Sequence, residues 1–190
     1  MSPLIVCLRR FTDSRGWFSE TWNDKRLRLQ GVDARFCQDN QSYSRSAGTL
    51  RGLHFQAPPF AQAKLVRCLR GRIFDVAVDI RKESPSFGQW VGIELSADNG
   101  KQLFIPAGYA HGFLTLEADC EIAYKVDNPY SPECDGGVAW NDPAIGVDWP
   151  MAGLEPVLSD KDAVLPLLNQ LEVKFAYDGQ PMEALREVAG

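Results

Sequence analysis

The sequence contains few histidines and no cysteine pair of the kind that binds metals. Two of its 190 residues are histidine, and its five cysteines show no Cys-x-x-Cys spacing. An odd number of cysteines would leave one thiol unpaired in an oxidising compartment, so reduced thiols are the simpler interpretation. No apolar run of about 18 residues occurs, and the start lacks a basic segment followed by a small-residue cleavage site. We therefore expect a cytoplasmic protein that is neither exported nor membrane-spanning.

Positive charge is also scarce. The formal net charge is −5 and the sequence pI is about 5.1. Nucleic acids and anionic membranes need a positive field on their partner, so neither is expected as the main ligand. An anionic small molecule would need arginine and lysine placed locally. With 190 residues and 45% hydrophobic content, the chain is long enough for one core, which predicts a single domain over residues 1–190. Residues from about 178 to 190 are polar enough to form a peripheral tail.

Alternating apolar and polar residues predict an all-β fold. In residues 73–81 the apolar side chains at 74, 76, 78 and 80 share one face, while Asp75, Asp79 and Arg81 share the other. This pattern predicts a half-buried strand. Residues 90–96 and 121–126 repeat the same period of two, and turns rich in glycine, proline and asparagine separate the segments. The spacing is typical of a jelly-roll sandwich or barrel with a few short helices.

Two short helices are predicted. Asn23 precedes DKRLRLQ, and Gly31 follows it. These are the start and stop signals of one helix. A second helix is predicted from Ser159 to Leu168.

The two histidines lie in different motifs, and each could be structural or functional. His111 ends the pattern Gly100-x5-Pro106-x-Gly108-x2-His111, which resembles the second motif of the cupin superfamily. Metal-binding cupins also have a first motif with two histidines one residue apart and a later glutamate. Here His54 is followed by Gln56, and no acid stands at the glutamate position. A transition metal normally needs three or four such ligands, so no metal site is expected.

A longer resemblance covers residues 11–165. Its ordered motifs are RFTDSRGWFSE, FCQDNQSYS, LRGLHFQ, AKLVRCLRGRIFDVAVDIR, SPSFGQWVGIELSA, FIPAGYAHGF, KVDNPYSP, WNDPAIGVDWP and LSDKD. Together they resemble the dTDP-4-dehydrorhamnose 3,5-epimerase family, which serves dTDP-L-rhamnose biosynthesis. The resemblance implies a cofactor-free homodimer with shared active sites. It also implies that the substrate is dTDP-4-dehydro-6-deoxy-D-glucose, which is inverted at C3 and C5 to give the L-lyxo product.

Epimerisation beside a ketone needs a base at carbon, a cation or donor at oxygen, and an acid for proton return. By resemblance, His54 matches the family's base, and Asp162 matches the carboxylate that orients and charges it. Lys64 matches the cation near the 4-keto oxygen. Tyr130 matches the acid that protonates the opposite face, which turns proton exchange into inversion.

Each catalytic role has a structural alternative. Asp162 stands three residues after Ser159, which is also the spacing of a capping box at a helix start. Lys64 could be a solvated strand lysine, and Tyr130 could be an aromatic residue in an interfacial turn. His111 has no partner acid at a recognisable spacing, so we expect it at the sugar or pyrophosphate and not as a second base.

The resemblance also implies a nucleotide site. Arg15, Arg51 and Lys161 match positions that line the ligand, and an arginine can donate two parallel hydrogen bonds to a phosphate. Glu20, Gln38 and Asn40 match positions that contact the nucleotide. The segment RGWFSE is expected to cross to the partner of a dimer and to help build the partner's site.

The sequence departs from the family pattern at two places. Gln41-Ser42-Tyr43 stands where His-Ser-Arg is common, and Pro129 replaces a second tyrosine before Tyr130. These differences leave open a different nucleotide or epimerisation at one carbon. Two alternatives therefore remain: a mono-epimerase of another deoxysugar pathway, and a non-catalytic cupin that binds a sugar nucleotide.

Overall fold

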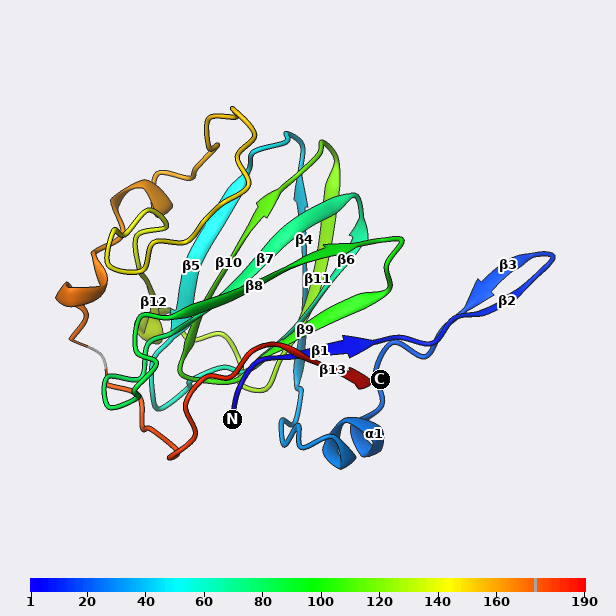
Figure 1. Ribbon diagram of the computed structural model, residues 1–190, viewed down its shortest axis with the longest axis horizontal. Helices are drawn as coiled ribbons and strands as arrows, with labels where there is room; N and C mark the ends of the chain where they lie inside the picture. The colour runs from blue at the N-terminus through cyan, green and yellow to red at the C-terminus, as the bar shows by residue number, and fades with distance from the viewer. Residues whose placement is uncertain (173) are drawn as a thin grey trace.

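The alternating segments form two β-sheets that lie face to face in the computed structural model, which describes residues 1–172 and 174–190 (Figure 1). The six-stranded sheet has the order β13 (Arg186–Ala189), β1 (Leu4–Cys7), β9 (Lys101–Ile105), β6 (Lys64–Arg70), β11 (Cys120–Val126) and β4 (Gln38–Ser44). The five-stranded sheet has the order β12 (Asp135–Gly137), β5 (Leu50–Gln56), β10 (Tyr109–Thr115), β7 (Arg72–Asp79) and β8 (Trp90–Ser96). The predicted all-β jelly roll is confirmed. In the described residues, no helix is long and apolar enough to cross a membrane.

Apolar side chains pack in three layers. The layer between the two sheets includes Val66, Ile73, Leu103 and Ile122. A second layer covers the outer face of the five-stranded sheet, where its other half is supplied by Val138, Ile145, Trp149, Leu168, Leu171 and Phe175. A third lies under α1 (Asp24–Leu29). The alternating faces predicted for residues 90–96 and 121–126 are confirmed, because Val91, Ile93 and Leu95 and also Ile122 and Tyr124 belong to the layer between the sheets.

The strand predicted in residues 73–81 is present as β7 (Arg72–Asp79), but the prediction that it is half-buried is wrong. Phe74, Val76, Val78 and Ile80 pack outward against later loop residues, among them Trp149 and Leu168. The charged face points into the sandwich, where Asp75, Asp79 and Arg81 are all buried. Both faces of β7 are therefore covered. The pattern alone could not show this, because the covering loops come from a distant part of the chain.

The first predicted helix is confirmed as α1, and the Oδ1 of Asn23 accepts a hydrogen bond from the N–H of Arg26 at 3.1 Å. The second is wrong. Residues 159–168 contain the short 3₁₀ turn η2 (Asp162–Val164), and a separate turn η3 (Leu168–Gln170) follows. Pro166 explains the break, because it disfavours helical backbone at the residue before it. That residue, Leu165, is indeed extended. A further 3₁₀ turn, η1 (Pro132–Cys134), precedes β12.

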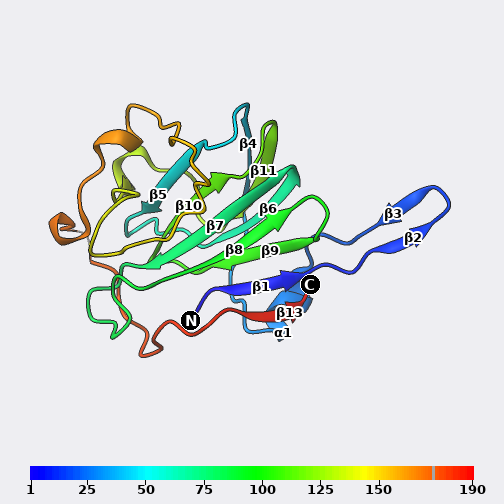
Figure 2. The same ribbon diagram turned by 45° about the horizontal axis from the view of Figure 1, so that its top comes forward.

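A two-stranded hairpin projects from the body of the molecule. It consists of β2 (Phe11–Asp13) and β3 (Gly16–Phe18). Figures 1 and 2 show it extending away from both sheets. Trp17 and Phe18 are exposed on it. Large apolar side chains exposed on a projecting ribbon are typical of an interaction surface.

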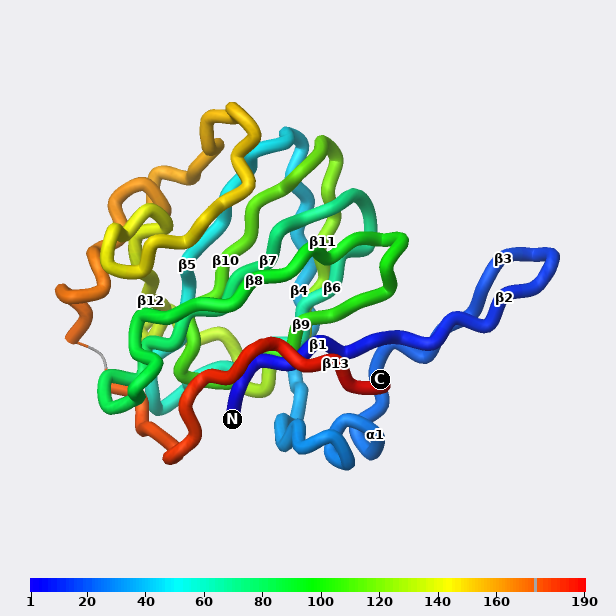
Figure 3. Tube along the Cα trace, viewed as in Figure 1, coloured from blue at the N-terminus to red at the C-terminus, as the bar shows by residue number. Residues whose placement is uncertain are grey.

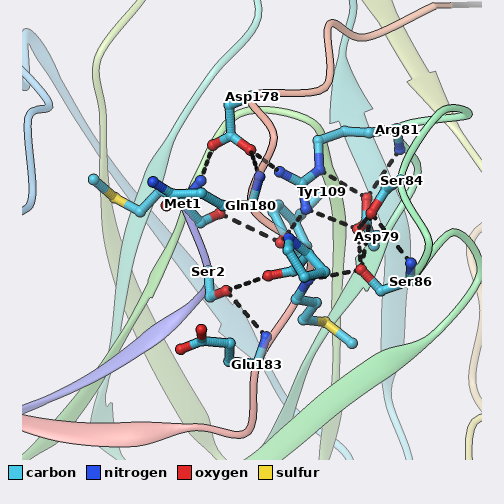
Figure 4. A network of polar contacts seen from close by, with 12 residues as sticks. Met1, Ser2, Asp79, Arg81, Ser84, Ser86, Tyr109, Asp178, Gln180 and Glu183 are labelled. Atoms are coloured by element: carbon cyan, nitrogen blue, oxygen red, sulfur yellow. Dashed lines mark hydrogen bonds and ion pairs between the residues drawn. The ribbon is translucent and has the colours of Figure 1, made fainter.

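The end of the chain returns to the first strand. β13 pairs in parallel with β1, so part of the predicted tail is an edge strand, and the two segments run together in Figure 3. Figure 4 shows the polar network around Arg81 and Asp79, which reaches Asp178 in the C-terminal segment. The buried guanidinium of Arg81 donates to Asp79, to the Tyr109 hydroxyl and to Asp178, at 2.7–3.0 Å. This network joins β7, β10 and the C-terminal segment.

Candidate active site

The two histidines lie side by side on neighbouring strands. His54 of β5 and His111 of β10 are paired across the ladder. Gly52 permits this approach: its φ is +125°, and a Cβ there would lie 2.5 Å from the Cα of Gly112. A larger residue would therefore push the strands apart. The glycine of the LRGLHFQ motif thus fixes where His54 sits relative to His111.

His54 contacts Asp162. Its Nε2 lies 2.5 Å from the Oδ1 of Asp162, which is buried, while 30% of the His54 side chain is exposed. The Oγ of Ser159 accepts a hydrogen bond from the backbone N–H of Asp162 at 3.1 Å. The capping contact and the carboxylate–imidazole contact therefore occur together. Burial opposes ionisation of Asp162, but the hydrogen bond and charge of His54 outweigh it and lower the pKa of the carboxyl.

His111 has an acid partner that the sequence analysis missed. Its Nε2 lies 2.7 Å from the Oδ1 of Asp75, and both side chains are buried. Burial lowers the pKa of His111, and Asp75 offsets part of that effect. The one available signal was the alternation in residues 73–81, which placed Asp75 among charged residues facing away from the apolar side. The Oδ2 of Asp75 is buried without a hydrogen-bond partner among the described residues.

Lys64 is buried and not a solvated strand lysine. Lys64 is 8% exposed, and its Nζ donates a hydrogen bond to the backbone oxygen of His54 at 3.4 Å. Burial lowers the pKa of Lys64 to about 8, although the charges of Asp75 and Asp135 act in the opposite direction. The ammonium group therefore lies beside the two histidines.

Two neighbouring cavities hold most of the predicted site residues. The histidine cavity has a volume of 270 Å³ and is lined by Ser42, Arg51, His54, Lys64, His111, Phe113, Tyr124, Ser159, Lys161 and Asp162. The tyrosine cavity has a volume of 120 Å³ and is lined by Gln38, Asn40, Phe55, Gln56, Gln62, Lys64, Tyr124, Tyr130 and Asp135. Lys64 and Tyr124 border both cavities. The fold therefore gathers residues from β4, β5, β6, β10, β11 and η2 around two cavities that share Lys64 and Tyr124.

Tyr130 lines the tyrosine cavity and is also exposed to solvent. It is 58% exposed, and its hydroxyl lies 3.4 Å from the Oδ2 of Asp135. The same carboxylate oxygen accepts a hydrogen bond from the Nζ of Lys161. Asp135 was also missed by the sequence analysis. It joins the tyrosine to a lysine of the histidine cavity.

Arg15 and Glu20 do not reach the cavities of their own chain. Arg15 lies at the tip of the β2–β3 hairpin, where its side chain is 88% exposed and pairs with Asp13 at 2.6 Å. Glu20 follows the hairpin and accepts a hydrogen bond from Asn23 at 3.1 Å. Of the eight residues predicted to contact substrate, these two alone line neither of the two cavities.

Gln56 occupies the position of a metal-binding histidine in the first cupin motif, but its amide is bound to backbone groups. Its Nε2 donates to the oxygen of Pro129 at 3.0 Å, and its Oε1 accepts from the N–H of Ser131 at 2.8 Å. Within residues 1–172 and 174–190, histidine, cysteine and acidic side chains form no group of three that could hold a metal ion.

Comparison with known proteins gives the family. The family model described as dTDP-4-dehydrorhamnose 3,5-epimerase matches residues 2–170. The chain belongs to this epimerase family. A dTDP-4-dehydrorhamnose 3,5-epimerase of Sinorhizobium fredii is 56% identical over 173 residues, which are 91% of this chain and 88% of that protein.

Crystal structures of the epimerase family are also similar in fold. A dTDP-4-dehydrorhamnose 3,5-epimerase from Bacillus anthracis, with TDP and PPi bound, is 52% identical with a TM-score of 0.84. The match covers 87% of this chain and 93% of the Bacillus chain. A dTDP-6-deoxy-D-glucose-3,5-epimerase from Legionella pneumophila, in complex with dTDP-4-keto-L-rhamnose, is 42% identical with a TM-score of 0.85. That match covers 92% of this chain and 100% of the Legionella chain.

Proposed function

We propose that this chain is a dTDP-4-dehydrorhamnose 3,5-epimerase that inverts C3 and C5 of dTDP-4-dehydro-6-deoxy-D-glucose. The observation that carries the proposal is the contact of 2.5 Å between His54 and Asp162, beside a buried lysine, in one cavity. A base, its orienting carboxylate and a cation are the groups needed to remove a proton next to a ketone. The identity of the sugar and of the nucleotide is inferred from the names of the similar proteins.

His54 is the base. Its imidazole can take the proton from C3 or C5, and Asp162 stabilises the imidazolium that forms. The lowered pKa of Asp162 keeps that carboxyl ionised at neutral pH. Because His54 is partly exposed, its proton can also exchange with water.

Lys64 stabilises the enolate. Removal of the proton moves negative charge onto the 4-keto oxygen, and a buried ammonium interacts with that charge more strongly than a solvated one would. His111 lines the same cavity next to Lys64. The lowered pKa of His111 favours its neutral form. We place this neutral imidazole at the sugar or pyrophosphate.

Tyr130 is the acid. A proton returned by His54 would restore the starting configuration, so inversion requires a donor on the other face of the ring. Tyr130 lines the tyrosine cavity, across Lys64 and Tyr124 from the histidine cavity. Its phenolic hydroxyl can donate a proton to the enolate carbon.

Arg51 and Lys161 bind the diphosphate, and Gln38 and Asn40 contact the nucleotide. Arg51 is oriented by two hydrogen bonds, from its Nε to the Oγ of Ser44 at 3.2 Å and from its Nη2 to the oxygen of Tyr43 at 3.1 Å. An arginine held in this way has less side-chain freedom to lose when a phosphate binds.

Arg15 and Glu20 complete the nucleotide site of a second copy of the chain. Support comes from the projecting hairpin, whose Arg15 pairs with Asp13 and whose Trp17 and Phe18 are exposed. The functional unit is therefore a homodimer with shared active sites, acting in dTDP-L-rhamnose biosynthesis in the cytoplasm.

Incubation with dTDP-4-dehydro-6-deoxyglucose in deuterated water, followed by NMR, tests the proposed function. We expect deuterium at both C3 and C5 and formation of the L-lyxo product. Exchange at one carbon would instead identify a mono-epimerase of another pathway. No exchange, with binding retained, would identify a non-catalytic protein that binds sugar nucleotides.

The pH dependence of kcat/KM tests Lys64. This parameter reports ionisations of the free enzyme, and the pKa of Lys64 is about 8. The protonated form is the active one, so kcat/KM should fall as pH rises through about 8. A Lys64→Arg variant is the control, because arginine stays protonated and its profile should lack this decline whatever its absolute rate. A flat wild-type profile up to about pH 10, near the ordinary pKa of lysine, would contradict the role of Lys64.

A further inference from the structure

The segment that carries Tyr130 is held on both sides by one buried side chain. Tyr130 lies between β11 and η1, where the backbone has no strand or helix hydrogen bonds of its own. Gln56 is 4% exposed. Its Oε1 accepts from the N–H of Ser131 at 2.8 Å, and its Nε2 donates to the oxygen of Pro129 at 3.0 Å. Gln56 therefore holds the residue before Tyr130 and the residue after it.

Two further contacts complete this support. The Nε2 of Gln56 also donates to the backbone oxygen of Phe60. Gln38, from β4, accepts a hydrogen bond from the N–H of Tyr130 at 3.1 Å and donates to the Oδ1 of Asn40 at 2.8 Å. Three successive backbone positions, 129–131, are thus fixed by two amide side chains from neighbouring parts of the cavity wall.

The same strand carries His54 and Gln56. Residues i and i+2 of a strand point to the same face and lie about 6.6–6.8 Å apart along it. β5 is bonded on both sides, with His54 and Gln56 paired to Gly137 and Asp135 of β12, and His54 also paired to His111 of β10. A central strand of this kind is rigid. The position of the Tyr130 segment is therefore tied to the position of His54.

We propose that Gln56 is a positioning residue that sets Tyr130 against His54 across the sugar ring, and so determines that the enolate is protonated on the face opposite to abstraction. The inference rests on the proposed epimerase function. Gln56 acts through the backbone on either side of Tyr130 and does not itself touch the reacting atoms. The amide replaces the second histidine of a metal-binding cupin motif, and from that inward-facing place it binds a loop.

The chemistry makes the position of Tyr130 critical. Proton transfer needs a donor within hydrogen-bonding reach of the carbon, and a displacement of about 1 Å can lower a rate about 10²-fold. Without Gln56, the N–H of Ser131 and the oxygens of Phe60 and Pro129 lose their buried partner, so the segment must move to find water. Abstraction by His54 does not depend on these contacts.

The test compares proton exchange with inversion in deuterated water. In a Gln56→Leu variant we expect inversion to fall about 10- to 100-fold, while exchange at C3 and C5 stays within about threefold of the wild type. The ratio of exchange to inversion should therefore rise at least about tenfold, with deuterium appearing in substrate of retained configuration. KM should change little. Partial unfolding would lower both rates together and leave the ratio unchanged.

Two other variants sharpen the test. Gln56→Glu has nearly the same volume and keeps the acceptor for Ser131, but it loses the donors to Phe60 and Pro129, so the ratio should shift in the same direction. Asn99→Ala is the matched control. Asn99 also holds a turn from both sides, accepting from the N–H groups of Ser96 at 3.2 Å and Lys101 at 2.9 Å, and it lines neither of the two cavities. Its ratio should equal that of the wild type.

The outcomes separate the two proposals. Wild-type protein that exchanges neither proton would overturn the proposed function. Wild-type protein that exchanges and inverts, together with Gln56 variants whose ratio equals the wild-type ratio, would overturn the role of Gln56 and leave the epimerase function standing. A ratio that rises in both Gln56 variants and not in Asn99→Ala supports the inference.

Discussion

His54→Ala is expected to abolish solvent exchange at both C3 and C5 of the substrate. The variant removes the one group that takes the proton, and loss of a general base typically costs about 10²–10⁴-fold. The neighbouring His111 should not substitute, because its burial lowers its pKa and so disfavours the imidazolium that would form if it took the proton. Exchange measured by NMR is a sharper test than turnover, because it reports abstraction even when inversion fails.

Three comparisons control this result. His54→Ala should still bind dTDP, because Arg51 and Lys161 are unchanged. Asp162→Asn should lie between the wild type and His54→Ala, since the imidazole keeps its hydrogen bond but loses the charge that stabilises its protonated form. The role of His54 would be wrong if His54→Ala exchanged both protons at a rate near wild type while His111→Ala did not.

Tyr130→Phe is expected to stop inversion while exchange continues. Phenylalanine keeps the ring but has no proton to deliver, and a general acid contributes about 10²–10⁴-fold to a rate. His54 can still remove the proton and return a deuteron to the same face, since 30% of its side chain is exposed to solvent. Deuterium should therefore accumulate at C3 and C5 of substrate that keeps its configuration.

Tyr43→Phe is the matched control for this variant. Tyr43 is an exposed tyrosine whose hydroxyl bonds to Asp119 and which lines neither cavity. Its loss should leave exchange and inversion unchanged. If Tyr130→Phe inverted the sugar at the wild-type rate, the acid would be another group, and Tyr124 would be the first candidate because it borders both cavities.

Local patterns in the sequence predicted much of the fold correctly. Alternation with a period of two identified strands, and Asn23 marked the start of α1. Such features depend on residues within a few positions of each other. The same reasoning gave the wrong burial for the strand in residues 73–81 and a wrong helix over residues 159–168. In the first case distant loop residues cover the face that β7 turns outward. In the second, Pro166 disfavours helical backbone at Leu165, which ends the short turn η2.

The sequence by itself determined the all-β class, the missing metal-binding histidine at Gln56 and, through its family motifs, the candidates His54, Lys64, Tyr130 and Asp162. Only the tertiary structure decided which of these meet. The contacts of His54 with Asp162, Gln56 with Ser131 and His111 with Asp75 join residues 108, 75 and 36 positions apart. Such contacts depend on which strands are neighbours and in which register, and no local pattern specifies either. The position of Arg15 is likewise decided by the tertiary structure, because Arg15 lies on a hairpin that projects away from both sheets.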